Sequence, residues 1–89
     1  MNPNIAESTS ILLVKVNAAL DAQLANIQRQ CQPEEFELQR RLFGATMAGL
    51  LDILNPIYRE HPSLKPTQMG GSYVLPNIAQ SVAQLVNAA

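Results

Sequence analysis

The residues with the greatest capacity for chemistry form one short run, Tyr58-Arg59-Glu60-His61. His61 is the only histidine, and a histidine with an unperturbed imidazole can act as a general base near neutral pH. If this run is helical, Glu60 points away from His61, because consecutive helical residues do not share a face. No other residue completes a mechanism, and a histidine at a helix end also complements the helix dipole. We therefore expect no catalytic residue and no enzymatic activity.

Cys31 is the only cysteine, so the chain can form neither an internal disulfide nor a metal site built from several cysteines. Its position continues an apolar stripe with three- and four-residue spacing, and a free cysteine is usually a small buried hydrophobe. No set of histidine, cysteine and carboxylate residues has the spacing of metal ligands. We predict neither a metal site nor a cofactor.

Three arginines near the first predicted bend could form a small basic patch, namely Arg29, Arg40 and Arg41. The glutamates at positions 34, 35 and 37 lie close enough in sequence to neutralise it. The formal net charge of the whole chain is −1, whereas nucleic-acid binding depends on clustered lysine and arginine. A nucleic-acid partner is therefore not expected.

The rest of the chain must be organised around Leu42–Leu54, with the sequence LFGATMAGLLDIL. This stretch contains no proline and few β-branched residues, which favours helix over strand. It is apolar on nearly every side, and a helix of this kind must be buried on most of its faces. With 89 residues the chain forms one domain with a thin core, so covering this helix is difficult.

The first helix is predicted over Ser10–Gln30, with a hydroxyl residue at positions 8–10 as its N-cap. Residues 1–8 are predicted to form a flexible arm, because Pro3 and two asparagines oppose regular structure. The pair Gln32-Pro33 then breaks the chain and starts a second helix, since proline is favoured at the first helical position. The short break predicts two antiparallel neighbours, a helical hairpin.

The second helix is predicted over Pro33–Leu54, and two interpretations remain at Pro56. The helix could continue with a kink to His61, or Asn55 could cap a separate short turn, and we prefer the capped turn. Residues 63–75 contain turn formers without periodicity and are predicted to be an irregular connector. A closing helix follows from Pro76 to about Asn87. The predicted fold is all-α, in a single domain spanning residues 1–89.

Two apolar rows follow the second helix, and the closing helix is too short to cover a whole row. One row provides our candidate interface, together with two small residues that permit close approach: Phe36, Phe43, Met47, Leu50, Leu54, Gly44 and Ala48. The other row consists of Leu38, Leu42, Ala45, Gly49 and Ile53. One row must face the first helix, and which one remains open. The uncovered row predicts a helical bundle completed by dimerisation.

The expected function is non-enzymatic protein–protein interaction, as a homodimer or as an adaptor, chaperone or inhibitor of another protein. Charged residues make up only 15% of the chain, which favours a surface covered by a partner. The first alternative is a small-molecule or catalytic site at a dimer interface around Tyr58–His61. The second is membrane-surface association through the nearly uncharged C-terminal third, which lacks the basic residues typical of such helices. The N-terminal residues contain no basic segment typical of a signal peptide, so we expect a cytoplasmic protein.

Overall fold

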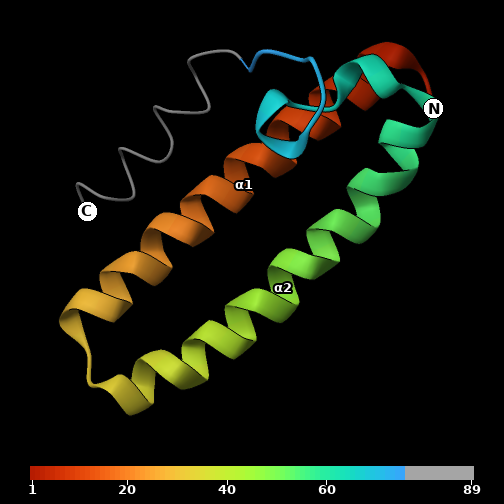
Figure 1. Cartoon of the computed structure of the whole chain (residues 1–89). Helices are drawn as coiled ribbons and strands as arrows, with labels where there is room; N and C mark the ends of the chain where they lie inside the picture. Colours follow the sequence, from red (N-terminus) through yellow and green to blue (C-terminus); the bar gives the residue numbers. More distant parts are fainter. Residues whose placement is uncertain (76–89) are drawn as a thin grey trace.

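The structure is a computed structural model that describes residues 1–75, and these residues form a helical hairpin (Figure 1). Two long helices, α1 (Pro3–Gln30) and α2 (Pro33–Glu60), run side by side in opposite directions. Two short 3-10 helices follow, η1 (Pro62–Leu64) and η2 (Thr67–Met69). The predicted all-α class and the hairpin are confirmed. The closing helix predicted from Pro76 lies outside the described residues.

The start of α1 differs from our prediction. The helix begins at Pro3 instead of Ser10, so residues that we expected in a flexible arm form its first turns. Asn2 is the N-cap, and its side-chain oxygen accepts a hydrogen bond of 2.8 Å from the backbone N–H of Asn4. Pro3 occupies the first turn, where its missing N–H removes no helical hydrogen bond. Ala6, one turn further on, is fully buried, which fixes this turn against the rest of the molecule.

The bend between the helices is confirmed at Gln32-Pro33. Pro33 lies at the start of α2, and Glu34 and Glu35 occupy its first turn, where the helix dipole favours negative charge. Cys31 is the C-cap of α1, with extended backbone and an exposed side chain. The prediction that Cys31 is a buried hydrophobe is therefore wrong, because the stripe of α1 ends before the bend.

The preferred interpretation at Pro56 is also wrong, because α2 continues through this residue to Glu60. Proline has no N–H, so the carbonyl of Asp52 lacks its usual helical partner. Pro56 and Asp52 are both exposed residues, so this part of the helix lies on the surface. The next two residues, Ile57 and Tyr58, are buried, and their packing holds the last turn of α2 in helical form.

The buried core lies at one end of the hairpin. Ala6 and Ser10 of α1 pack there against Leu54, Ile57 and Tyr58 of α2. The hydroxyl groups of Ser10 and Tyr58 share a buried hydrogen bond of 2.7 Å, so neither buried oxygen lacks a partner. Between residues 11 and 53, every residue of the two helices is at least partly exposed.

The segment after α2 folds back over this core, and backbone hydrogen bonds define its conformation. The backbone N–H of Tyr73 donates to the carbonyl of Lys65 (3.0 Å), and that of Thr67 donates to the carbonyl of Tyr73 (3.1 Å). Pro66, between them, is fully buried. A Cβ on Gly71 would overlap the Lys65 carbonyl, so only glycine fits this close approach. The predicted irregular connector is thus a pinned loop with two turns of 3-10 helix.

The loop is also tied to α1 by a side chain. The hydroxyl of Tyr73 donates a hydrogen bond of 2.8 Å to a carboxylate oxygen of Glu7. This hydrogen bond, followed by burial of the hydroxyl and the negative charge of Glu7, raises the pKa of Tyr73. The contact joins positions 66 residues apart in sequence and fixes the end of the described chain against the first turns of α1.

Candidate interaction surface

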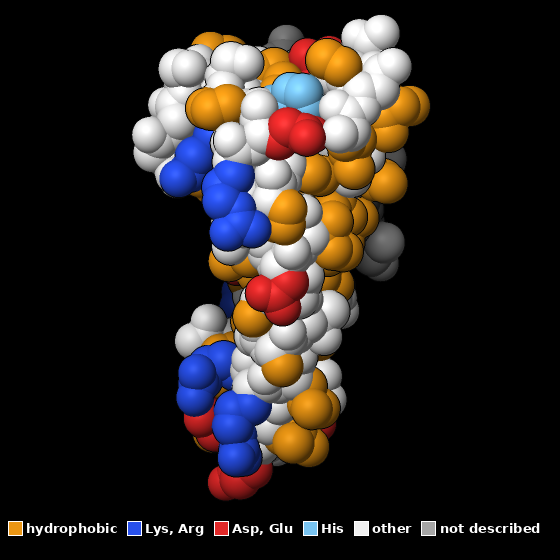
Figure 2. All heavy atoms as spheres, turned by 90° about the vertical axis from the view of Figure 1, so that its right-hand side faces the viewer, with side chains coloured by type: hydrophobic (Ala, Val, Ile, Leu, Met, Phe, Trp, Pro, Cys, Tyr) orange, Lys and Arg blue, Asp and Glu red, His pale blue; other side chains and the backbone are white. Residues whose placement is uncertain are grey.

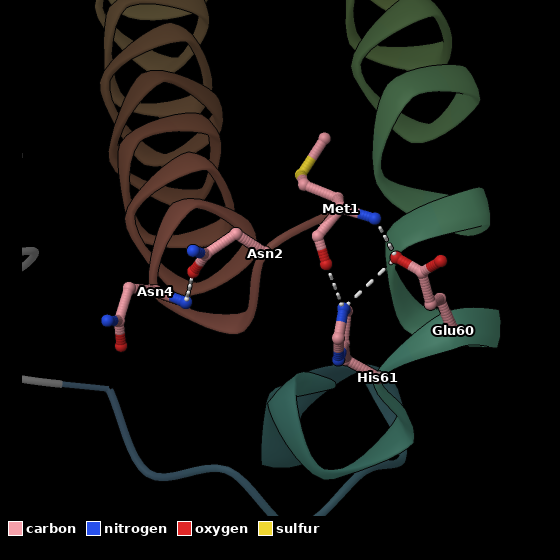
Figure 3. A network of polar contacts seen from close by, with 5 residues as sticks. All are labelled: Met1, Asn2, Asn4, Glu60 and His61. Atoms are coloured by element: carbon pink, nitrogen blue, oxygen red, sulfur yellow. Dashed lines mark hydrogen bonds and ion pairs between the residues drawn. The ribbon is translucent and has the colours of Figure 1, made fainter.

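The polar run Tyr58–His61 does not converge on one site. Tyr58 is buried, and its hydroxyl is engaged by Ser10. Arg59 is exposed on another side of the helix. Glu60 and His61 form a separate cluster with the start of the chain (Figure 3). Tyr58 and Arg59 both line a small pocket with Asn55 and Lys65, whereas Glu60 and His61 contact the start of the chain, so the four residues do not form one site.

Glu60 and His61 hold the beginning of the chain against the end of α2 (Figure 3). The ammonium group of Met1 donates to Glu60 Oε1 at 2.6 Å, and His61 Nε2 lies 2.9 Å from the carbonyl oxygen of Met1. His61 Nε2 also lies 3.1 Å from Glu60 Oε1. We expected these neighbours to point apart if both were helical. His61 is instead the C-cap, and its backbone has left the helix, so the two side chains can meet.

The charge of Glu60 is stabilised within this cluster. The hydrogen bond from the Met1 ammonium group, followed by the charge of that group, lowers the pKa of the Glu60 carboxyl. A lower pKa makes this carboxylate a weaker base. The cluster is best explained as a clasp between the ends of the two helices.

The arginines predicted as a possible basic patch are mostly engaged locally. Arg40 forms an ion pair with Glu37, which lowers the pKa of that carboxyl, chiefly through the hydrogen bond. Arg29 donates a hydrogen bond to the side-chain oxygen of Asn26. These contacts lie within single helical turns on an exposed surface, so they contribute little to stability.

The first apolar row of α2 faces α1. Leu54 is only 3% exposed, and Leu13 of α1 packs against the cluster that contains it. The other large members, Phe36, Phe43, Met47 and Leu50, are half-buried. Gly44 and Ala48, which we grouped with this row as interface candidates, are exposed on the edge beside it. The row is therefore mainly the contact between the two helices.

The second apolar row lies on the surface. Leu38, Leu42 and Ile53 are 50%, 54% and 50% exposed. A similar row follows α1 at a spacing of seven and four residues, where Ile5, Leu12 and Val16 are 55%, 56% and 36% exposed. We refer to these residues together as the apolar face: Ile5, Leu12, Val16, Leu38, Leu42 and Ile53.

Both rows belong to the same side of the hairpin. Going around each helix in the direction of the chain, the exposed row comes about a third of a turn before the residues that contact the other helix. In two antiparallel helices, positions related in this way lie on the same side of the pair. Near the bend, Ile27 of α1 and Leu38 of α2 line one shallow pocket, which places Leu38 beside α1 at this end. Figure 2 shows hydrophobic side chains gathered along one edge of α2, whereas most of the lysine and arginine side chains lie along the other edge.

The helical periodicity places few charges on the apolar face. Among the charged residues of α2, only Glu35 and Glu60 lie on the same side of the helix as Leu38, Leu42 and Ile53. They lie near opposite ends of that helix. On the α1 side the other positions on this face are neutral: Thr9 lies between Ile5 and Leu12, and Gln23 follows Val16. The face is thus a long uncharged strip with an acidic residue near each end.

A second apolar depression lies on the opposite side of the hairpin. It has a volume of about 470 Å³, and residues of α1, α2 and η2 line it, among them Val14, Gly44, Leu51 and Met69. A Cβ on Gly44 would meet no atom within 4 Å. Within residues 1–75, therefore, close packing does not require glycine at this position.

Comparisons with family models, with curated protein sequences and with solved structures found no match to this chain. Among the described residues, no helix is both long enough and apolar enough to cross a membrane. The same residues contain no group of three or more histidine, cysteine or acidic side chains placed to hold a metal ion.

Proposed function

We propose that this chain is a small non-enzymatic protein–protein interaction module that associates with a second copy of itself through the apolar face. The observation that supports the proposal is the exposure of this face, whose six large side chains are between 36% and 56% exposed. Exposed apolar patches of this kind are typical of interaction surfaces. The homodimer forms a bundle of four helices, with α1 and α2 contributed by each copy.

The burial pattern supports a partner for the hairpin. Between residues 11 and 53 neither helix buries a residue, although these positions make up most of both helices. Helices in water gain most of their stability from packing an apolar face, and two helices alone provide only one contact line. A second hairpin placed on the apolar face supplies the missing layer.

Burial of the apolar face provides a driving force for association. Full burial of one large apolar side chain contributes about 1.5–3 kcal/mol. Each copy contributes six such side chains that are about half exposed.

A second copy suits this face because two uncharged apolar surfaces can cover each other. In a two-fold dimer the same patch lies on both partners, so an uncharged strip covers an uncharged strip. Each helix has 28 residues and is about 42 Å long at 1.5 Å per residue, which provides a long contact. With an antiparallel arrangement of the two hairpins, the acidic ends remain at the rim and in water. Neither glutamate is then buried unpaired.

The experiment that tests the proposal is light scattering coupled to size exclusion. The native chain is expected at roughly twice its mass of 9.7 kDa at micromolar concentration. Leu42→Glu places a charge in the middle of the apolar face, and it is expected to shift the protein to the monomer mass. A native chain that remains a monomer at high concentration contradicts the proposal.

The matched control is Leu51→Glu. Leu51 lies on the same helix and is 42% exposed, but it lines the depression on the opposite side of the hairpin. This variant is expected to keep the dimer mass. If Leu51→Glu dissociates the dimer and Leu42→Glu does not, the interface has been assigned to the wrong side. Circular dichroism of both variants verifies that the helices are retained.

The proposed location is the cytoplasm. The single thiol of the chain, Cys31, is exposed and unpaired in the described structure, which suits a reducing compartment. Within the proposed function, the homodimer is the working form in which the chain could then act as an adaptor, chaperone or inhibitor. Pull-down of the native dimer and of the Leu42→Glu variant separates partners that require the dimer from partners that bind elsewhere.

A further inference from the structure

A small polar pocket lies between the last turns of α2 and the loop that follows it. Its volume is about 280 Å³, and it is lined by Asn55, Tyr58, Arg59 and Lys65. Two of these residues are cations from different segments, Arg59 on α2 and Lys65 between η1 and η2. Neither cation forms an ion pair with an acidic side chain of residues 1–75.

The nearby acidic residues do not neutralise these two cations. Glu60 is engaged by the Met1 ammonium group and by His61. Asp52 precedes Arg59 by seven positions, which places it about 10 Å away along the helix axis. The pocket therefore has two positive charges, and the carboxylates nearest in sequence are committed elsewhere or distant.

The fold holds Lys65 in this place. Its carbonyl accepts a hydrogen bond from Tyr73 (3.0 Å), and its backbone N–H donates to Pro62 (3.2 Å). Pro66, which follows it, is fully buried, and Gly71 lies so close that it can carry no side chain. The backbone at Arg59 is helical and follows the buried Tyr58, while its side chain is exposed. Positive charge at Arg59 complements the C-terminal dipole of α2, but that effect does not explain why Lys65 is held beside it.

The chemistry of the lining selects a class of ligand. Arg59 has a planar set of donors that matches two oxygens of one carboxylate or phosphate group, and Lys65 adds a mobile point charge. The side-chain amide of Asn55 supplies a neutral donor. We propose that this pocket is a binding site for a single oxyanion group, a phosphate or a carboxylate, held between Arg59 and Lys65. The site is separate from the apolar face and does not depend on the proposed dimer.

The test uses the full chain and two simple probes, inorganic phosphate and acetate, at constant ionic strength. Backbone and side-chain amide signals are followed by NMR during each titration. Saturable shifts are expected at Asn55, Arg59 and Lys65, and the probe with the lower dissociation constant identifies which oxyanion the site prefers. Shifts that grow linearly without saturation, or that are spread over the whole surface, overturn the proposal.

Two variants and a matched control locate the binding. Arg59→Gln and Lys65→Gln each remove one charge from the pocket, and each is expected to weaken phosphate or acetate binding roughly tenfold, as the loss of a charge-assisted hydrogen bond does. Arg41→Gln removes the same charge from the same helix, at an exposed position outside the pocket. It is expected to change the dissociation constant less than twofold. If all three variants weaken binding equally, attraction is due to overall charge and the site does not exist.

Discussion

The buried hydrogen bond between Ser10 and Tyr58 allows the sharpest test of how the core is built. Ser10 is 2% exposed and Tyr58 is 6% exposed, so neither hydroxyl can turn to bulk water. Tyr58→Phe removes one hydroxyl and leaves that of Ser10 without this partner. Ser10→Ala leaves the hydroxyl of Tyr58 in the same situation. A buried polar group without a partner costs about 1–3 kcal/mol, more than the hydrogen bond itself contributes.

The double variant Ser10→Ala/Tyr58→Phe removes both hydroxyls and leaves no unpaired group. We therefore expect it to be less destabilised than the sum of the single variants. The coupling energy should be about 0.5–3 kcal/mol, the range found for residues in direct contact. Alanine is a better helix former than serine, but this gain occurs in both Ser10→Ala and the double variant. It therefore cancels in the coupling energy.

The assay is urea unfolding followed by circular dichroism, with all four proteins at one concentration because a dimer's stability depends on concentration. In a thermal experiment, each kcal/mol corresponds to a shift of about 4–8 °C in Tm for a domain of this size. Distant and independent sites show coupling of only about 0.3–0.5 kcal/mol. A coupling energy within that lower range would refute the contact between the two hydroxyls.

Three further predictions concern the loop and the exposed edge of α2. Gly71→Ala should destabilise the protein measurably in urea, because the new methyl group overlaps the backbone of Lys65. Gly44→Ala meets open space and should instead stabilise α2 by about 0.5–1 kcal/mol; a loss of stability would show that a close contact had been missed. The raised pKa of Tyr73 means that its hydrogen bond to Glu7 contributes fully below about pH 10 and is lost as the pH rises through the raised value. The urea midpoint should therefore fall in alkaline solution, and Tyr73→Phe should lack this part of the pH dependence.

The sequence predicts the hairpin because its decisive signals are local. Proline at position 33, followed by acidic residues, marks a helix start that depends on backbone chemistry alone. The same logic applies at Asn2-Pro3, where an N-cap precedes proline, but three hydroxyl residues at positions 8–10 offered a competing start. Ala6 decides between them, because its burial requires helix from the beginning of the chain.

Tertiary contacts explain the other differences. At Pro56 the local rule favours a helix end, yet burial of Ile57 and Tyr58 outweighs the lost hydrogen bond. The two apolar rows of α2 could be read from spacing, but spacing alone does not say which row meets α1. The place of Lys65 in the pocket that we propose as an oxyanion site was missed for a similar reason. It lies in an aperiodic loop whose course is set by backbone hydrogen bonds and by a close approach at Gly71.

The confinement of the core to one end of the hairpin has a consequence for how the molecule opens. Local opening requires less free energy where few apolar contacts are broken. Amide hydrogens near the bend at Cys31 and Pro33 should therefore exchange with solvent much faster than those around Ser10 and Ile57, where the buried residues lie. The helical turns next to the bend are therefore expected to open locally, while the end that carries Tyr58 stays closed. A second copy on the apolar face would slow exchange most in the half of the hairpin that has no buried residue of its own.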